Sequence, residues 1–298
     1  MKTVVMTGGT SGLGKVAAER IRAEPGTRLL LGARTSAGSA GTLPLDLSRL
    51  ASVREFAQAI ERELGPAEID VLVLNAGAQF SDVNARTEDG IEPTFAVNHL
   101  AHYLLARLLL PRLAAGATVI ITTSDTHDPK KVPFGAPRDL DPAALARPPA
   151  TAKAGHVAGF RAYASSKLCN ILTARALAAL PGIAARQVSV IAYNPGLTPG
   201  TALARDWPAW ARLAFSLARF IAPAARLSTV EQAGDTLAGL ALGRVTPPPG
   251  RLYASLVRRQ LTWPDPSALA RRDDVMRSLW RESARLTGLP DQPMRLAV

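Results

Sequence analysis

The sequence predicts a single α/β domain, in which a doubly wound parallel β-sheet carries helices on both faces and a helical substrate cap. Short apolar runs alternate with amphipathic helical patterns along much of the chain. Strands that are apolar throughout are typical of parallel sheets covered on both sides. Right-handed crossovers then wind the chain outwards in two directions. We therefore expect one domain over residues 1–298, with about seven strands.

The expected strands are the apolar runs Thr3 to Met6, Arg28 to Leu31, Thr42 to Leu45, Val71 to Leu74, Thr118 to Thr122, Val188 to Tyr193 and Leu252 to Ala254. Helical patterns lie between them, at Leu13 to Arg22, Val53 to Leu64, Phe95 to Leu113, Tyr163 to Leu180 and Thr229 to Leu242. The stretch from Arg34 to Asp46 is too short to hold the helix of a complete crossover.

Three further segments stand out. Asp125 to Arg161 is rich in Pro, Gly and Ala, and Pro195 to Leu227 is partly helical but interrupted by prolines. Long excursions of this kind are often functional, and we expect residues 195–227 to cap a substrate. Apolar residues on one helical face predict a C-terminal packing helix over about 266–287, through Val275, Met276, Leu279, Trp280 and Leu286.

Composition excludes several classes of protein. Hydrophobic residues make up 47% of the 298 residues, enough for a sizeable core. No apolar run approaches the length of a membrane span, and the run Val4 to Met6 is too short for a signal peptide. We expect a cytoplasmic protein. Cys169 is the only cysteine, which excludes an intrachain disulfide and a multi-cysteine metal site.

The net charge of +11 raises the question of nucleic-acid binding. The arginines are scattered among alanines, leucines and prolines, without a basic run or a basic patch interleaved with aromatic residues. We therefore predict no nucleic-acid partner. We also predict no metal site, because the spacing of the histidines fits no common ligand pattern: His99, His102, His127 and His156.

A glycine-rich loop joins the first strand to the first helix and reads Thr7-Gly-Gly-Thr-Ser-Gly-Leu-Gly14. Glycines allow a tight turn and close approach to a pyrophosphate, and the helix N-terminus offers free N–H groups to the phosphates. The position between strand and helix makes this cluster a strong indication of a dinucleotide site. The residues expected to contact the cofactor are Gly8, Thr10, Ser11, Gly12, Leu13 and Gly14.

The end of the second strand indicates which dinucleotide is used. Enzymes that use NAD usually place an acidic residue there for the adenosine ribose. This chain has Arg34 after Ala33 instead, and a guanidinium matches the oxygens of a 2′-phosphate. Arg34 therefore predicts NADP(H).

Further cofactor contacts are expected at the ends of the third and fourth strands, where open α/β sheets bind ligands. Asp46, followed by Leu47, is placed to meet the adenine edge or to serve as a turn carboxylate. Asn75, Ala76 and Gly77 let the backbone pass close to the cofactor ribose, or Asn75 ties neighbouring strands together.

Four polar residues predict proton transfer. Tyr163 and Lys167 are four positions apart on a helix and share one face. A lysine ammonium ~4 Å from a phenol at an effective dielectric of ~20 favours the phenolate by ~4 kcal/mol, which brings the tyrosine pKa towards neutrality. Ser124 follows the fifth strand and supplies a hydroxyl for a substrate oxygen. Asn98, in the preceding helix, is placed to order a water behind the lysine.

Taken together, these motifs resemble the short-chain dehydrogenase/reductase family from residue 2 to about 255. The resemblance rests on TGGTSGLG, Asn75-Ala76-Gly77, Asn98, Ser124, Tyr163-Ala-Ser-Ser-Lys167 and Asn194-Pro195-Gly196. It implies a Rossmann fold, often in a dimer or tetramer. It also implies that Tyr163 donates the proton in reduction, that Lys167 lowers its pKa and holds the nicotinamide ribose, and that Ser124 binds the carbonyl. Asn98 would anchor a relay water, and Pro195, Gly196 and Thr198 would shape the nicotinamide pocket.

Within that family the chain is similar to the retinol dehydrogenase and protochlorophyllide reductase branch. The stretch between Ser124 and Tyr163 is unusually long, and Ser-Lys-Leu-Cys-Asn ends the tyrosine motif. Protochlorophyllide reductases carry a cysteine directly after Pro-Gly, where this chain has Leu197, which counts against that activity. Cys169 is expected to be a packing residue rather than a proton donor.

The sequence therefore predicts an NADP(H)-dependent oxidoreductase that interconverts a ketone or aldehyde and an alcohol on a lipophilic or polycyclic small molecule. Apolar residues crowd the expected cap: Leu203, Trp207, Trp210, Leu213, Phe215, Leu217, Phe220 and Ile221. The alternatives are reduction of a C=C bond in a protochlorophyllide-like substrate and a non-catalytic NADPH sensor. Peripheral contact with an anionic membrane through Arg205, Arg212 and Arg219 is a further alternative, and the chain is expected to be a monomer or homo-oligomer.

Overall fold

The structure is a computed structural model that describes residues 1–35, 40–149, 151–152, 154–198 and 228–294. Its centre is one eight-stranded sheet with the order β3-β2-β1-β4-β5-β6-β7-β8. The first seven strands run parallel, and only β8 pairs antiparallel with its neighbour. The strands are β1 (Lys2–Thr7), β2 (Thr27–Ala33), β3 (Thr42–Pro44), β4 (Ile69–Leu74), β5 (Leu113–Thr122), β6 (Ser189–Asn194), β7 (Tyr253–Val257) and β8 (Gln260–Thr262). The predicted doubly wound α/β fold is confirmed.

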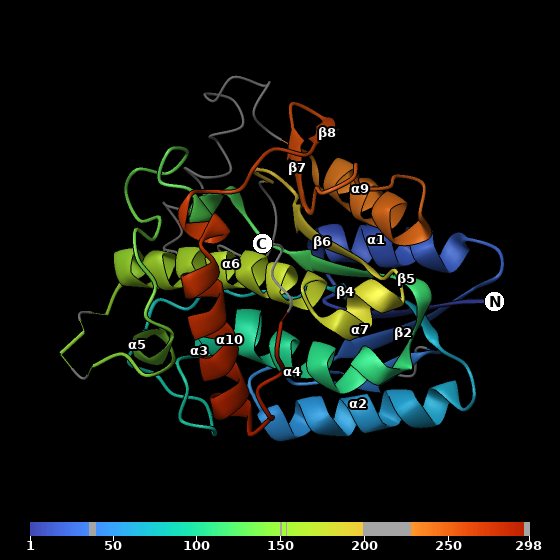
Figure 1. The fold of residues 1–298 in the computed structure, drawn as a ribbon, viewed down its shortest axis with the longest axis horizontal. Helices are drawn as coiled ribbons and strands as arrows, with labels where there is room; N and C mark the ends of the chain where they lie inside the picture. The colour runs from blue at the N-terminus through green and yellow to red at the C-terminus, as the bar shows by residue number, and fades with distance from the viewer. Residues whose placement is uncertain (36–39, 150, 153, 199–227, 295–298) are drawn as a thin grey trace.

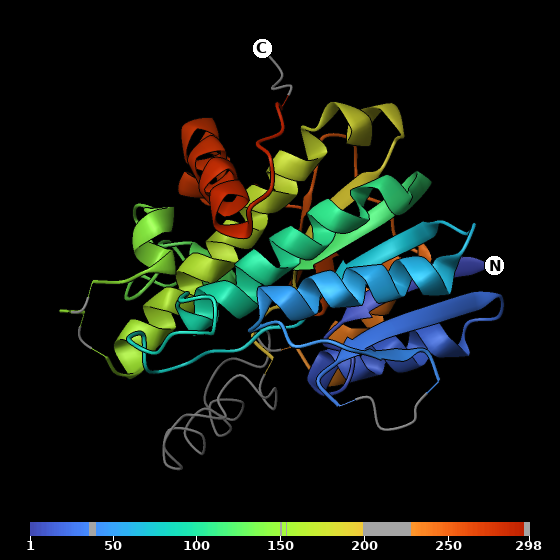
Figure 2. The same cartoon turned by 90° about the horizontal axis from the view of Figure 1, so that it is seen from below.

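Helices cover both faces of the sheet (Figure 1). On one face α1 (Gly12–Ala23) and α9 (Val230–Leu242) pack in one apolar cluster with residues of β1, β2 and β4. On the other face the larger cluster contains α2 (Leu50–Leu64), α4 (Ala101–Leu109) and α6 (His156–Ala178), which Figure 2 shows side by side. Shorter helices are α3 (Pro93–Phe95), α5 (Pro142–Ala146) and α7 (Pro181–Ala185).

The C-terminal helix α10 (Asp273–Thr287) packs outside α6 and α4. Trp280 is 1% exposed, and its ring makes an edge-to-face contact with the Tyr103 ring, with centroids 4.9 Å apart. The Arg107 guanidinium lies 5.0 Å from the Trp280 ring and donates to the Pro290 carbonyl at 2.7 Å. A cation over aromatic faces stabilises such a contact, so this apolar face is held to the body of the fold.

Among the described residues, no helix combines the length and apolarity needed to cross a lipid bilayer.

Several boundaries differ from those expected. β8 was not predicted, because its hairpin turns at Arg258 and Arg259, both with positive φ (51° and 65°), where Asn and Gly are the usual signals. The expected helix from Phe95 to Leu113 is divided into α3, a π-helical turn at Ala96–Leu100, α4 and a 3-10 turn at Leu110–Arg112, and β5 already begins at Leu113. α6 begins at His156, so Tyr163 lies about two turns inside the helix rather than at its start.

Residues 199–227, which contain most of the expected cap and its apolar and arginine residues, lie outside the described part of the chain. Immediately after them α9 begins as the sequence suggests. Thr229 and Gln232 form a capping box, and Gly243 ends the helix in the left-handed conformation. Both are strong local signals for helix ends.

The contact between α1 and α9 provides a test of the packing. A Cβ added to Gly234 would lie 2.5 Å from the Val16 Cβ and 2.7 Å from the Leu13 carbonyl oxygen, whereas one added to Gly239 would meet nothing within 4 Å. Gly234→Ala should therefore lower the free energy of unfolding by roughly 1–3 kcal/mol through overpacking. Gly239→Ala should raise it by roughly 0.5–1 kcal/mol because alanine favours the helix. Urea denaturation of both variants checks this pair, and equal effects would contradict the packing.

Candidate active site

The predicted site residues gather at the carboxyl ends of the central strands. In the strand order, β1 is flanked by β2 on one side and β4 on the other, so the chain leaves this point in both directions. Such a switch point leaves a crevice beyond the strand ends, where open α/β sheets bind ligands. The loops after β1, β4, β5 and β6 carry the glycine motif, Asn75, Ser124 and Pro195 respectively.

The glycine loop has the backbone geometry of an anion-binding turn. Gly8 has φ 70° and a Cβ there would lie 2.5 Å from the Ala76 Cα. A Cβ on Gly14 would collide with the Gly8 carbonyl oxygen. Ser11 is the N-cap of α1 but makes no side-chain capping hydrogen bond, and Thr10 and Ser11 are exposed. At the N-terminus of α1 the loop therefore presents backbone N–H groups without a side-chain cap, together with the exposed hydroxyls of Thr10 and Ser11. This arrangement fits a phosphate.

Asn75 joins three strands. Its side chain donates to the Gly8 carbonyl at 2.9 Å and accepts from the Thr122 hydroxyl at 3.0 Å. The Thr7 hydroxyl oxygen accepts from the backbone N–H groups of Asn75 and Ala76. The sequence left two roles open for Asn75, a place beside the cofactor ribose and a link between strands. In the structure its amide forms the link between strands. Its contribution to a cofactor site is to hold the backbone of Ala76 and Gly77 in place.

The loops after β2 and β3 carry the residues that the sequence predicted for the adenine side of a cofactor. The Asp46 carboxylate accepts from the backbone N–H and hydroxyl of Ser48, at 2.9 and 2.7 Å, so it serves as a turn carboxylate. The Leu47 side chain is 9% exposed and belongs to the larger core cluster. Arg34 is exposed directly after β2. β2 ends at Ala33 and β3 begins at Thr42, so the crossover between them is as short as expected.

Ser124, Tyr163 and Lys167 come together at the end of β5. Tyr163 and Lys167 are 6% and 3% exposed, and the Lys167 Nζ lies 5.4 Å from the centre of the Tyr163 ring. Nζ also donates to the Thr122 carbonyl at 3.3 Å, and a Cβ on Gly77 would lie 3.2 Å from it. The Ser124 side chain forms a hydrogen bond with Tyr163. The buried side chains of Tyr163 and Lys167 thus form one polar group with the partly exposed Ser124.

Burial shifts both pKa values in this group towards the neutral forms. It lowers the pKa of Lys167 to about 8, with no compensating charge among the described residues. It raises the pKa of Tyr163 above its usual value, and the hydrogen bond with Ser124 opposes that shift only in part. The expected fall of the tyrosine pKa towards neutrality is therefore wrong for this structure, because that argument omitted the desolvation of the phenol itself. Tyr163 therefore carries its proton at neutral pH, which is the state that a proton donor must have.

Asn98 lies in the π-helical turn Ala96–Leu100, a distortion that often marks functional sites. Its side chain accepts from the Ala78 N–H at 2.7 Å, and it donates to the Ala78 carbonyl at 2.8 Å and the Ser166 hydroxyl at 3.0 Å. The Asn98 amide is thus hydrogen-bonded to the loop after β4 and to α6. Its role in this structure is to fix those elements around Lys167, whereas the relay water remains a prediction.

The remaining predicted residues lie after β6. Gly196 has φ 72° and its N–H donates to the Asn194 side chain at 3.1 Å. The Thr198 hydroxyl donates to the carbonyls of Pro195 and Gly196, both at 3.3 Å. Cys169 is completely buried in the larger core cluster, and burial raises its pKa, which agrees with a packing role.

Two residues of the site network were missed from the sequence. The Thr7 hydroxyl is 2.9 Å from the His102 Nε2, and the His102 Nδ1 is 3.1 Å from the Asn98 carbonyl. His102 is 2% exposed, and burial lowers its pKa to about 4. It therefore connects the first strand to the π-helical turn as a neutral ring. The signal in the sequence was the place of Thr7 at a strand end, directly before the glycine loop.

The buried charge of Lys167 should appear in the pH dependence of stability. The lysine pKa falls from 10.5 to about 8 on folding, so between these values the unfolded chain binds a proton that the folded protein has released. The free energy of unfolding therefore rises with pH across this window, by about 3 kcal/mol at most for this group. Lys167→Met should be more stable than the parent at pH 7.5, and the difference should shrink by pH 10. Denaturation at both pH values measures it, with Lys15→Met, at an exposed position, as the control that shows no such change.

Comparisons with known proteins agree with this geometry. The family profile described as short chain dehydrogenase matches residues 2–136. Human retinol dehydrogenase 12 is 30% identical over 305 residues, covering 97% of this chain and 87% of that protein. A Streptomyces protein provisionally named a daunorubicin C-13 ketoreductase is 35% identical over 211 residues, 65% of each chain. A solved structure from Mycobacterium paratuberculosis superimposes with a TM-score of 0.67 at 26% identity, covering 98% of this chain and 96% of that one. The chain belongs to the short-chain dehydrogenase/reductase family of oxidoreductases.

Proposed function

We propose that this protein uses NADP(H) to interconvert a ketone or aldehyde and an alcohol on a lipophilic small molecule. The observation that carries the proposal is the group formed by the buried Tyr163 and Lys167 with the partly exposed Ser124, beside the glycine loop. It combines a neutral phenol, a hydroxyl in contact with it and a cation close behind. These are the parts needed to hold a carbonyl and transfer a proton to its oxygen.

The residues present fit a dinucleotide. The uncapped N-terminus of α1 and the turn at Gly8 and Gly14 would hold the pyrophosphate. Arg34, exposed at the end of β2, would pair with a 2′-phosphate, which is the reason to propose NADP(H). Lys167 and the backbone at Gly77 would hold the nicotinamide ribose, and Pro195, Gly196 and Thr198 would border the ring. When bound, the nicotinamide supplies or accepts the hydride.

The protein's own residues then manage the proton. In reduction the Tyr163 phenol donates its proton to the carbonyl oxygen, and Ser124 donates a hydrogen bond to the same oxygen. The phenolate that remains lies near the Lys167 ammonium, whose charge stabilises it. In oxidation the same phenolate accepts the proton of the alcohol. Burial of the group strengthens these interactions because little water screens them.

The lipophilic substrate class is supported by composition and by relatives. The stretch 195–227 follows the proposed nicotinamide pocket and is rich in aromatic and aliphatic residues. Leu197, near its start, is an apolar side chain that is 45% exposed. The names of two relatives specify retinol dehydrogenation and ketone reduction.

Removal of one hydroxyl tests the mechanism. Tyr163→Phe should lower turnover with NADPH and a carbonyl substrate by roughly 10²–10⁴-fold, because it removes the general acid. Affinity for NADPH should remain, since the glycine loop lies elsewhere. Tyr193→Phe is the matched control: it also removes a buried hydroxyl, which donates to the Ala233 carbonyl at 2.9 Å on the other face of the sheet. Lys167→Ala should lower both turnover and cofactor affinity. Turnover is measured from NADPH absorbance over a panel of ketones and aldehydes. Near-normal turnover by Tyr163→Phe would exclude Tyr163 as the proton donor.

Replacement of Arg34 tests the cofactor preference. Arg34→Ala should weaken NADPH binding by about ten- to a hundredfold, as expected for loss of a charge-assisted contact, and should leave NADH binding almost unchanged. Arg277→Ala, an exposed arginine on α10, is the control and should change neither. Calorimetric titration with both cofactors measures the difference. Tighter binding of NADH than of NADPH by the parent protein would contradict the assignment.

A further inference from the structure

Ser124 lies at the start of a tight turn whose later residues are more buried than the serine itself. A 3-10 turn at Asp125–His127 follows β5, and the Ser124 Oγ accepts from the Thr126 N–H at 3.3 Å. Ser124 and Asp125 are partly exposed, whereas His127 is only 1% exposed. The position of the serine therefore depends on how the end of this turn is anchored.

The contacts of His127 fix its protonation state. The backbone N–H of Ser267 points at the His127 Nε2 at 3.1 Å, and because a backbone N–H can only donate, Nε2 must be the unprotonated nitrogen. The proton then lies on Nδ1, which donates to the Ser124 carbonyl at 2.7 Å. Burial also lowers the pKa of His127, which favours the neutral ring despite the nearby carboxylates of Asp125 and Asp128.

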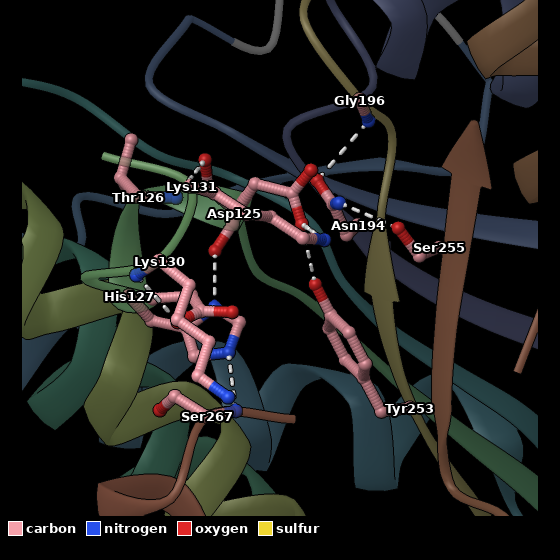
Figure 3. Close-up of polar contacts among 12 residues, drawn as sticks. Asp125, Thr126, His127, Lys130, Lys131, Asn194, Gly196, Tyr253, Ser255 and Ser267 are labelled. Carbon is pink, nitrogen blue, oxygen red and sulfur yellow. Dashed lines mark hydrogen bonds and ion pairs between the residues drawn. The ribbon is translucent and has the colours of Figure 1, made fainter. Parts of the chain in front are cut away.

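β7 holds the same turn from the other side (Figure 3). The Tyr253 ring meets the His127 ring edge-on, with centroids 5.3 Å apart. Its hydroxyl donates to the Asp125 carboxylate at 2.9 Å, and Lys131 pairs with the same oxygen at 2.5 Å. The residue after Ser124 and the residue that binds its carbonyl are thus both fixed by parts of the chain distant in sequence.

We propose that His127 is a positioning residue for Ser124: as the Nδ1–H tautomer it binds the serine's carbonyl and anchors the turn to Ser267, so that the serine hydroxyl faces Tyr163. The inference rests on the proposed function in so far as Ser124 binds the substrate carbonyl. A displacement of about 1 Å at a reacting group can cost on the order of a hundredfold in rate. Loss of the Nδ1 contact should therefore lower kcat even in a variant whose melting temperature stays close to that of the parent.

Two near-isosteric substitutions separate the two contacts of the ring. His127→Asn places an amide N–H near the position of Nδ1 and keeps the bond to Ser124 while losing that to Ser267. His127→Gln reaches the position of Nε2 and keeps an acceptor for Ser267 while losing the bond to Ser124. We expect kcat for carbonyl reduction to stay within about threefold of the parent in His127→Asn and to fall by roughly 10- to 100-fold in His127→Gln. The dissociation constant for NADPH should change little in either variant.

Thermal denaturation of both variants shows whether they remain folded, and His127→Phe, which keeps a ring against Tyr253 and loses both hydrogen bonds, should resemble His127→Gln in kcat. Equal losses in the Asn and Gln variants, or losses that follow the melting temperature, would mean a purely structural role and overturn the inference. The ¹⁵N chemical shifts of the parent protein's histidine rings give a test that needs no substrate. They should show His127 neutral with the proton on Nδ1 at pH 7, and a proton on Nε2 would also overturn it.

Failure of this inference is distinguishable from failure of the proposed function. If His127→Gln turns over normally while Tyr163→Phe does not, the proton donor stands and the positioning role falls. If Tyr163→Phe turns over normally, the proposed mechanism falls. The tautomer and the comparison of the Asn and Gln variants then still decide whether His127 holds the turn that contains Ser124.

Discussion

The site depends on a short chain of hydrogen bonds across the carboxyl ends of β1, β4 and β5. The Asn75 amide bridges the Gly8 carbonyl and the Thr122 hydroxyl, and the Thr122 carbonyl accepts from Asn170 at 2.9 Å and from Lys167 at 3.3 Å. Asn75 and Thr122 together thus connect the glycine loop to the helix that carries Tyr163. Because each of these groups is wholly or largely buried, an unsatisfied partner would be costly. The distance between the proposed phosphate and proton-transfer sites is therefore set by the sheet, without reliance on a mobile loop.

Burial sets the protonation states of Tyr163 and Lys167, and it also lowers the stability of the folded state. Lys167 is 3% exposed and has no counter-charge among the residues that the structure describes, and its burial lowers its pKa to about 8. An isolated buried ammonium is unfavourable in the folded state. The same desolvation keeps Tyr163 protonated and able to donate. The fold thus carries a local loss of stability at the residues proposed to transfer the proton, and the apolar clusters on both faces of the sheet compensate for it.

The sequence was sufficient to predict the architecture and the places of the main polar residues, because both leave local signals. Apolar runs marked the parallel strands, the helical pattern from Thr229 to Leu242 marked α9, and glycines marked the turn after β1. Features that depend on distant partners left no such signal. The commitment of the Asn98 amide to Ala78 and Ser166, the link between Thr7 and His102, and the bond from Ser267 to His127 join residues that only the fold brings together. The tyrosine pKa was mistaken for the same reason, since desolvation is a property of the packed environment.

The long excursion between Ser124 and Tyr163 raises a problem that the structure solves by backbone contacts. The chain must leave the end of β5 and return in a helix whose tyrosine faces the serine. Gly155 donates to the Ser81 carbonyl at 3.0 Å, and Glu92 donates to that of Ala146 at 2.8 Å, so the excursion is fastened to the loop after β4. A Cβ on Gly159 would collide with the Phe80 carbonyl oxygen, which shows that α6 meets this loop backbone against backbone about one turn before Tyr163. Asn98 holds the same loop at Ala78. The segment is therefore an extension of the frame that positions the proposed proton donor.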